Sequence, residues 1–278
     1  MLARDRFAVY RILSEPGPAG GKIRFFRFGI PLVLKVSYRL RSTESDALRF
    51  LSHALDKTRY EHLLEIPRLV DCYSDPLTGH SYTLMTRIEG ETLLQARTSM
   101  SQEQLREVYQ TLETFLCNVL WKIPQPAEIA GQVMRSTSGH GIPDPVCFRE
   151  DIVGPFASTL HCYVYLAGYG YCPDGKELPS EFMKEVSQQV RDILAADDVV
   201  FSHYDLRPYN IIVRDGQLAG IVDWEDSGWV AKHWLLHIFR DCVPCNGPPF
   251  TDYWRAQTFE ARTEAAFAAS FSLLRYYF

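Results

Sequence analysis

The chain of 278 residues is 46% hydrophobic and 23% charged, which excludes a disordered, collagen-like or coiled-coil protein. Its 29 basic and 34 acidic residues give a formal net charge of −5 without a basic cluster, so nucleic acid is not expected as a partner. The sequence has no apolar run of about 18 residues, and its seven cysteines are scattered through apolar segments. We therefore expect a cytoplasmic protein without membrane contact.

The first ninety or so residues favour a small antiparallel sheet with one helix. Apolar residues between Ala47 and Leu55 recur at helical spacing, which predicts an amphipathic helix that begins near Ser42 to Ser45. We expect this helix to pack on the sheet. Strands are expected in four β-rich runs, at residues 7–13, 22–28, 31–37 and 80–88.

Beyond Gly90 the pattern changes to helical periodicity. Ser101 and Gln104 form a capping-box pattern at the start of a long amphipathic helix, and a second helix is expected over residues 180–195. Residues 122–178 show no sustained period and are expected to form loops with short helices.

This change of pattern near residue 88 predicts two lobes joined by a short hinge. We place a nucleotide-binding lobe with the hinge at its end over residues 1–88, and a helical lobe over residues 89–278. Clefts between lobes are common ligand sites.

The strongest local signal is Asp215-Gly216 between two β-branched runs. It predicts a tight hairpin with strands 211–214 and 217–222. If residues 214 and 217 face each other, Asn210 faces Ile221 at the open end of the hairpin.

Three polar side chains then converge at that open end. Asp223 lies diagonally close to Asn210, and Asp205 lies a few residues before the hairpin. One amide and two carboxylates in this arrangement suit a divalent cation that prefers oxygen ligands, namely Mg²⁺.

The same residues carry a resemblance to known kinases. His203-Tyr204-Asp205-Leu206-Arg207-Pro208-Tyr209-Asn210 resembles the kinase catalytic loop H-x-D-L-x-x-x-N. Ile221-Val222-Asp223-Trp224-Glu225, followed by Gly228-Trp229, is similar to the I-[IV]-D-W-E…G-W of aminoglycoside phosphotransferase-like small-molecule kinases, particularly the fungal members. The D-F-G and A-P-E motifs of protein kinases are absent from the sequence.

Membership of this family implies an α+β, bilobal protein-kinase-like fold. Its N-lobe would be a small antiparallel β-sheet with one helix, and its larger C-lobe would be mainly helical. The resemblance also covers most of the chain, because it extends to residues 44–51, 66–69, 85–93 and 154–156.

The resemblance implies roles for the residues of the catalytic loop and hairpin. Asp205 would orient the substrate hydroxyl or accept its proton, and Arg207 would stabilise charge on the transferred phosphate. Asn210 and Asp223 would hold Mg²⁺ ions that bridge the phosphates of ATP.

The resemblance also implies how the nucleotide is held. Lys35, in a strand-like run, would reach the α- and β-phosphates of ATP, and its partner should be Glu44 on the following helix rather than Asp46. A phosphate-covering loop would lie in residues 14–22, which have glycines but not G-x-G-x-x-G. The adenine would lie against the hinge near Met85, Thr86 and Ile88.

Several neighbouring residues have alternative interpretations. Glu225 and Asp226 either attract a cationic acceptor or form a solvated acidic turn, and Tyr204 occupies a position where the family usually has Gly. His203 is interpreted as structural rather than as a base. The tryptophans 224, 229 and 234 are interpreted as packing residues. Cys242 and Cys245, with His233 and His237 upstream, have zinc-like spacing, although an amphipathic helix explains the histidines better.

The sequence therefore predicts an ATP- and Mg²⁺-dependent phosphotransferase that acts on a hydroxyl group of a small molecule. The alternative is a nucleotide-binding pseudokinase or interaction module without turnover, and a protein kinase is a third, weaker option. No pattern in the sequence favours an oligomeric state.

Overall fold

The computed structural model describes residues 3–17, 20–37, 43–55, 60–144, 149–171, 184, 186–241 and 246–274. The chain divides into two compact units. The first comprises residues 1–115 and 206–226, and the second comprises residues 116–205 and 227–278. A hairpin far along the sequence therefore folds with the N-terminal part of the chain.

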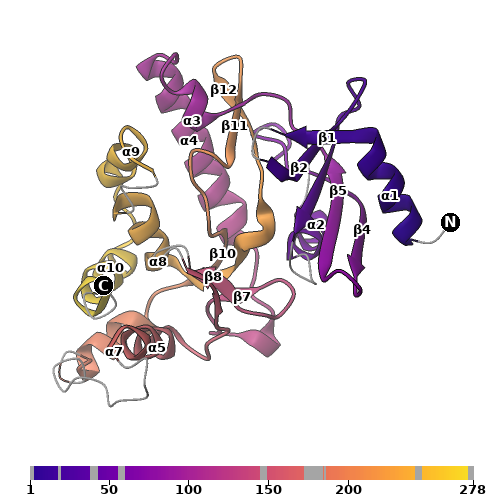
Figure 1. Ribbon diagram of the computed structural model, residues 1–278. Coiled ribbons are helices and arrows are strands. Elements are labelled where there is room, and N and C mark those ends of the chain that lie inside the picture. Colours follow the sequence, from indigo (N-terminus) through magenta and orange to yellow (C-terminus); the bar gives the residue numbers. More distant parts are fainter. Residues whose placement is uncertain are drawn as a thin grey trace. The chain divides into compact units, whose positions relative to one another are not determined.

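A five-stranded sheet with the order β1-β2-β3-β5-β4 forms the centre of the first unit (Figure 1). All its strand pairs are antiparallel, as the sequence predicted. The strands β1 and β4 were not predicted. The five strands are β1 (Ser14–Gly17), β2 (Gly20–Phe26), β3 (Leu32–Ser37), β4 (Leu69–Asp75) and β5 (His80–Thr86).

Side-chain alternation along β3 gives the sheet two different faces. Leu34 and Val36 are buried on one face, where they belong to an apolar cluster with Tyr82 and Leu84 of β5. Lys35, between them, points to the opposite face. The strand thus separates an apolar face from a face that carries a cation.

The apolar face is covered by the helix α1 (Ala3–Leu13), seen beside the sheet in Figure 1. The prediction of a strand at residues 7–13 was therefore wrong. A short apolar run does not distinguish a strand from a helix by period alone. Phe7 and Tyr10 are three residues apart, share one helix face and pack on the sheet, with the Phe7 and Tyr82 ring centres 5.6 Å apart.

The helix α2 (Thr43–Ala54) forms where the apolar spacing predicted it. Its buried residues include Ala47, Leu48 and Leu51, and it contacts β4 and the short 3₁₀ turn η4 (Trp224–Asp226). The first turn of α2 carries Glu44, whose side chain is buried.

The hairpin predicted at Asp215-Gly216 consists of β11 (Ile211–Arg214) and β12 (Gln217–Ile221). Asp215 and Gly216 both have positive φ angles, 54° and 77°, as a tight hairpin turn requires. The strand β6 (Glu91–Thr92) pairs with β11 and leads into α3 (Leu93–Ala96).

The predicted register of this hairpin was wrong by one residue at its open end. Arg214 does face Gln217, but a β-bulge follows, so that Ile211 rather than Asn210 faces Ile221. The backbone carbonyl of Asn210 instead accepts a hydrogen bond from the backbone amide of Val222, at 2.9 Å. Asn210 therefore lies closer to Asp223 than the regular register predicted.

The bulge has a physical cause in the segment that follows α2. Glu65 accepts a backbone hydrogen bond from Ile221 and donates one to Ala219, at 3.2 and 2.8 Å. A Cβ atom on Gly220, between them, would lie 2.6 Å from the Glu65 carbonyl oxygen and 2.6 Å from the Ile88 side chain.

Replacing Gly220 with Ala should therefore destabilise the protein. The added methyl group must displace backbone that is held on both sides, at an expected loss of roughly 1–3 kcal/mol of unfolding free energy. Urea denaturation measures this loss. A change within about 0.5 kcal/mol would show that the approach to Glu65 does not constrain the hairpin.

The helix α4 (Gln102–Asn118) carries the chain from the first unit into the second. It begins with the predicted capping box, in which the Gln104 amide donates to Ser101 Oγ at 3.2 Å and the Ser101 amide donates to Gln104 Oε1 at 2.9 Å. Its predicted inward residues are all buried: Leu105, Val108, Leu112, Phe115, Leu116 and, just beyond it, Val119.

The second unit contains a small sheet of order β10-β13-β7, a hairpin of β8 and β9, and helices. Its strands are β7 (Arg135–Ser136), β8 (Ile142–Asp144), β9 (Arg149–Val153), β10 (Val199–His203) and β13 (Ser227–Ala231). Its helical segments are η2 (Leu120–Lys122), η3 (Ala127–Ile129), α5 (Thr159–Tyr171), α7 (Gln188–Ala195), α8 (Lys232–Leu236), η5 (His237–Asp241), α9 (Phe250–Ala256) and α10 (Ala261–Leu274).

A buried hydrogen-bond chain joins the helices of this unit. Asp197 contacts His233 Nδ1 at 2.7 Å, and His233 Nε2 contacts the Tyr163 hydroxyl at 2.9 Å. His237, the second histidine of the zinc-like pattern, contacts Ser270 at 2.9 Å. Both histidines are therefore engaged in hydrogen bonds within this unit. The two cysteines of the zinc-like pattern lie outside the described residues.

Two helix predictions in this unit can be compared with the structure. Residues 159–171 form α5, although only short helices were expected there, because a segment apolar on all sides shows little periodicity. Within the helix predicted over 180–195, residues 188–195 form α7, which Ser187 caps with an extended backbone, while residues 180–183 and 185 lie outside the described residues. Among the residues that the structure describes, no helix is long and apolar enough to span a membrane.

Candidate active site

The cation-bearing face of the sheet holds Lys35 in a cluster of carboxylates. The Lys35 side chain is 11% exposed, and its Nζ atom lies 2.8 Å from Glu44 Oε2. Glu44 is fully buried in the first turn of α2. The ion pair implied by the resemblance is thus present, whereas Asp46 pairs with Arg49 at 3.3 Å.

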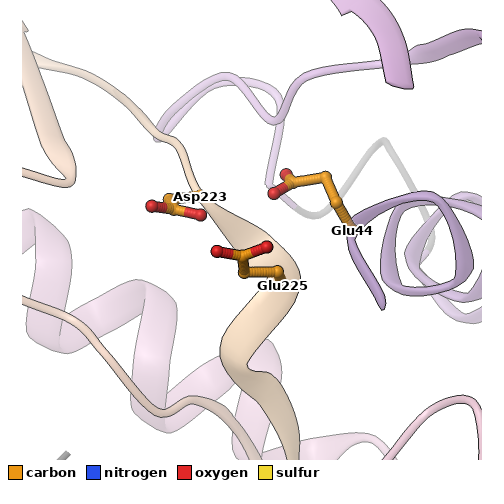
Figure 2. Close-up of side chains that lie close together, drawn as sticks. All are labelled: Glu44, Asp223 and Glu225. Atoms are coloured by element: carbon orange, nitrogen blue, oxygen red, sulfur yellow. The ribbon is translucent and has the colours of Figure 1, made fainter. Parts of the chain in front are cut away.

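Two more carboxylates reach Lys35 from the segment after β12. Asp223 forms an ion pair with its Nζ atom, and Glu225 Oε1 lies 3.3 Å from it. Oxygen atoms of Glu44, Asp223 and Glu225 all lie within 4.8 Å of one another. Figure 2 shows the three carboxyl groups close together, one from α2 and two from the segment after the hairpin.

A local distortion of the backbone brings Asp223 into this cluster. Its φ of 67° lies in the left-handed region, which a non-glycine residue occupies at some energetic cost and which is found frequently at functional sites. The next backbone amide, of Trp224, donates to Glu44 Oε1 at 3.0 Å, and the Trp224 indole donates to the Ile221 carbonyl at 2.8 Å. The Trp224–Glu44 hydrogen bond therefore joins the end of the hairpin to α2.

The cluster shifts the pKa values of its members. Burial alone would lower the pKa of Lys35, but the charges of Glu44, Asp223 and Glu225 raise it well above its usual value. Burial raises the pKa of Glu44 from 4.5 to about 7, against the opposing effect of Lys35, with further increase from Asp223 and Glu225. Three carboxylates around one ammonium group leave negative charge that a bound cation would compensate.

This shift predicts a pH dependence of stability in the metal-free protein. The unfolded chain releases the Glu44 proton near pH 4.5 and the folded chain near pH 7, so the unfolding free energy should fall as pH rises between these values. The expected fall is on the order of 3 kcal/mol. Urea denaturation of the wild type and of Glu44→Gln should show it as a difference in slope, and parallel pH profiles would contradict it.

The predicted site residues Arg207 and Asn210 lie just before β11 in the sequence. Asn210 is 3% exposed, and its backbone pairing with Val222 places it beside Asp223. Arg207 is buried, and its guanidinium lies 6.0 Å from the centre of the Tyr209 ring. Both belong to the same compact unit as Lys35.

Asp205 belongs to the second unit, where it follows β10 and is partly buried. His203 and Tyr204 precede it, and both side chains are buried. His203 is the last residue of β10 and pairs with Ser227, which suits the structural role expected of it. The catalytic role of Asp205 stays a prediction.

The predicted hinge residues Met85, Thr86 and Ile88 differ in their surroundings. Met85 is buried in β5 and faces Val33 of β3, so it shares the sheet face of Lys35. The Thr86 amide donates to the Arg68 carbonyl at 3.0 Å. Ile88, just past the strand, is buried against Ile212, Ala219 and Val222 of the hairpin segment.

Glu225 is the residue whose position sequence reasoning left open. An alternating strand would place residues 223 and 225 on one face and residue 224 on the other. The observed 3₁₀ turn η4 keeps that separation, because Trp224 is buried while both acids meet Lys35. The W-E pair after Asp223 was the available signal.

The donor set fits Mg²⁺, which prefers oxygen ligands and is commonly held by one or two carboxylates together with substrate phosphates. Among the described residues, the cluster of Glu44, Asp223 and Glu225 is the one group of three metal-binding side chains. The Asp223 side chain is 38% exposed, so an ion can reach it from solvent.

The two units and the antiparallel sheet together define an α+β protein-kinase-like fold, and comparisons with known proteins agree. A family model described as "Phosphotransferase enzyme family" (APH) matches residues 25–230, more than half of the chain. The chain belongs to this family. A search of curated proteins gives no significant match.

Solved aminoglycoside phosphotransferases have a similar fold. The apo form of a thermostable APH(4)-Ia mutant is 13% identical, covers 97% of this chain and 92% of its own, and gives a TM-score of 0.61. ADP-bound APH(2'')-Ib is 16% identical, with coverages of 100% and 91% and a TM-score of 0.58. The gentamicin complex of APH(2")-IIa is 17% identical, with coverages of 98% and 88% and a TM-score of 0.56. At these identities the likeness shows the fold.

Proposed function

We propose that the protein is an ATP- and Mg²⁺-dependent phosphotransferase that transfers the γ-phosphate of ATP to a hydroxyl group of a small molecule. The observation that carries this proposal is Lys35 held between Glu44 and Asp223, inside the segment that the phosphotransferase family model matches. Phosphoryl transfer depends mainly on positioning and charge neutralisation, which such a cluster can supply.

Residues 1–88 form the nucleotide-binding lobe in this proposal. Lys35 contacts the α- and β-phosphates, and Glu44 fixes its position from α2. Met85 lies on the same face of the sheet and packs beside the base. The amide of Thr86 is engaged with Arg68, so the backbone of Ile88 is the better candidate for donating to the adenine.

Asn210 and Asp223 would hold the Mg²⁺ ion. Bound Mg²⁺ neutralises charge on the nucleotide phosphates. The chain's own contribution is the bulge and the left-handed backbone, which bring these two side chains to one end of the hairpin. Glu225 adds a carboxylate on the Lys35 side of the cluster.

Asp205 orients the acceptor hydroxyl and accepts its proton as the new bond to phosphorus forms. Arg207, two residues further on, stabilises negative charge on the transferred phosphate. The proton thus leaves on the Asp205 carboxylate, and ADP leaves with the electrons of the broken phosphorus–oxygen bond.

The acceptor is a small molecule bound by residues 89–278. Support comes from neighbours of similar fold, whose structures include complexes with AMP-PNP and hygromycin B and with streptomycin and ATP. The sequence also has no A-P-E motif, which protein kinases carry. We further propose the cytoplasm as its compartment, because the described cysteines Cys72, Cys117 and Cys162 are not in disulfide bonds.

A screen of metabolite extracts tests the proposal. The protein is incubated with Mg-ATP and an extract, and mass spectrometry looks for compounds that gain the mass of one phosphate, with Asp205→Asn as the blank. Gain in the wild type alone supports the proposal. Stabilisation by Mg-ATP in a thermal-shift assay without any phosphorylated product would favour the pseudokinase alternative.

A further inference from the structure

A cavity of about 720 Å³ lies in the first unit, on the side of α2 that faces the segment 60–69. Its volume is in the range of sites for small ligands. It includes neither Lys35 nor Asp223, and of the predicted site residues only Thr86 lines it. The cavity is therefore separate from the carboxylate cluster.

One part of the wall of this cavity is apolar. Leu48 and Leu51 contribute from α2, and Tyr60, Leu64 and Leu69 contribute from the opposite side. Four of these side chains are buried and Leu69 is half-buried. An apolar wall favours a ligand with an apolar or aromatic body.

Arg68 is the group of the lining that can bind a negative charge on that ligand. Three arginines line the cavity, Arg49, Arg68 and Arg87, against two glutamates. Groups outside the lining pair with Arg49 and Arg87, through Asp46 and Glu89, and with Glu65, through Arg214. Arginine binds carboxylates and phosphates through paired hydrogen bonds.

The backbone around the cavity is held in place without a ligand. Arg68 donates from its amide to Thr86 Oγ1 at 2.8 Å and accepts from the Thr86 amide at 3.0 Å. The Arg87 amide donates to the Pro31 carbonyl at 2.9 Å. Glu65 is fixed to the hairpin by its two backbone bonds. A preformed site loses little free energy to ordering when a ligand binds.

We propose that this cavity is a second ligand site, which binds a compact apolar molecule carrying one carboxylate, sulfonate or phosphate group. It takes its ligand independently of the nucleotide. The proposal rests on the cavity and not on phosphotransfer, so a chain without turnover would still bind such a molecule.

The probe for this site is anilinonaphthalene sulfonate, an aromatic anion that fluoresces in apolar surroundings. We expect saturable binding of one probe per chain, unchanged in stoichiometry at saturating Mg-ATP. Ser52 is exposed on α2 and lines the cavity, so Ser52→Trp should fill the space and weaken binding at least about tenfold. His53→Trp, next to it but outside the lining, is the control and should bind within about twofold of the wild type.

A second pair of variants tests the charge. Arg68→Glu should weaken probe binding by about tenfold, whereas Arg106→Glu on the exposed side of α4 should not. Thermal unfolding checks that each variant is folded. If Ser52→Trp does not fold, the result for Arg68→Glu decides the proposal. Full displacement of the probe by Mg-ATP, or equal affinity in the wild type and the folded cavity variants, would overturn the proposal.

Discussion

Asp205→Asn should reduce phosphate transfer by about 10³-fold while leaving Mg-ATP binding intact. The amide is close to the carboxylate in size but cannot accept the proton of the acceptor hydroxyl. In the proposed function the nucleotide contacts come from Lys35 and the hairpin end, which this substitution does not change. Steady-state rates with an acceptor found in the extract screen, together with the Kd of Mg-ATP, measure the two effects separately.

Asp215→Asn is the matched control for this variant. It makes the same chemical change in the exposed hairpin turn, where Asn also tolerates the left-handed backbone. Its transfer rate should equal that of the wild type. If Asp205→Asn retained most of its rate, Asp205 would not be the residue that handles the proton.

Lys35→Met should have the second large effect, on both stability and transfer. Lys35 is the cation that contacts three carboxylates, and one of them, Glu44, is fully buried. Removing one partner of a buried ion pair costs roughly 3–5 kcal/mol, so urea denaturation near pH 9, where Glu44 of the wild type is ionised, should show a loss of that size. The transfer rate should fall by about 10²-fold or more, because the phosphates lose a contact that neutralises charge.

A second substitution separates these effects. Lys35→Met combined with Glu44→Gln removes the unpaired buried charge and should recover much of the lost stability, but it should not recover transfer. Lys122→Met, at an exposed position of η2, is the control for loss of a lysine. If the double variant were as unstable as Lys35→Met alone, burial of Glu44 would not explain the loss.

Much of the site was readable from the sequence because its signals are local. The Asp215-Gly216 turn predicts a hairpin by itself, and the resemblance across His203 to Asn210 and Ile221 to Glu225 places chemistry at its end. The Lys35–Glu44 pair follows from the same resemblance, and alternation along β3 explains why Lys35 leaves the apolar face.

The misses depend on contacts between distant segments. The bulge at Ala219 requires the Glu65 backbone, which lies far away in the sequence. Residues 7–13 form a helix because Phe7 and Tyr10 find aromatic partners on the sheet. The helix α5 shows little period because most of its residues are apolar. Local patterns carry no information about such partners.

The central claim is that the end of the hairpin binds Mg²⁺ together with the triphosphate of ATP. Calorimetric titration of the protein with ATP, in the presence and absence of Mg²⁺, tests it most directly. In the wild type, Mg²⁺ should tighten ATP binding by at least about tenfold. In Asp223→Ala this dependence should disappear, whereas Asp215→Ala should retain it. Equal ATP affinity with and without Mg²⁺ in the wild type, or an undiminished Mg²⁺ effect in Asp223→Ala, would contradict the claim.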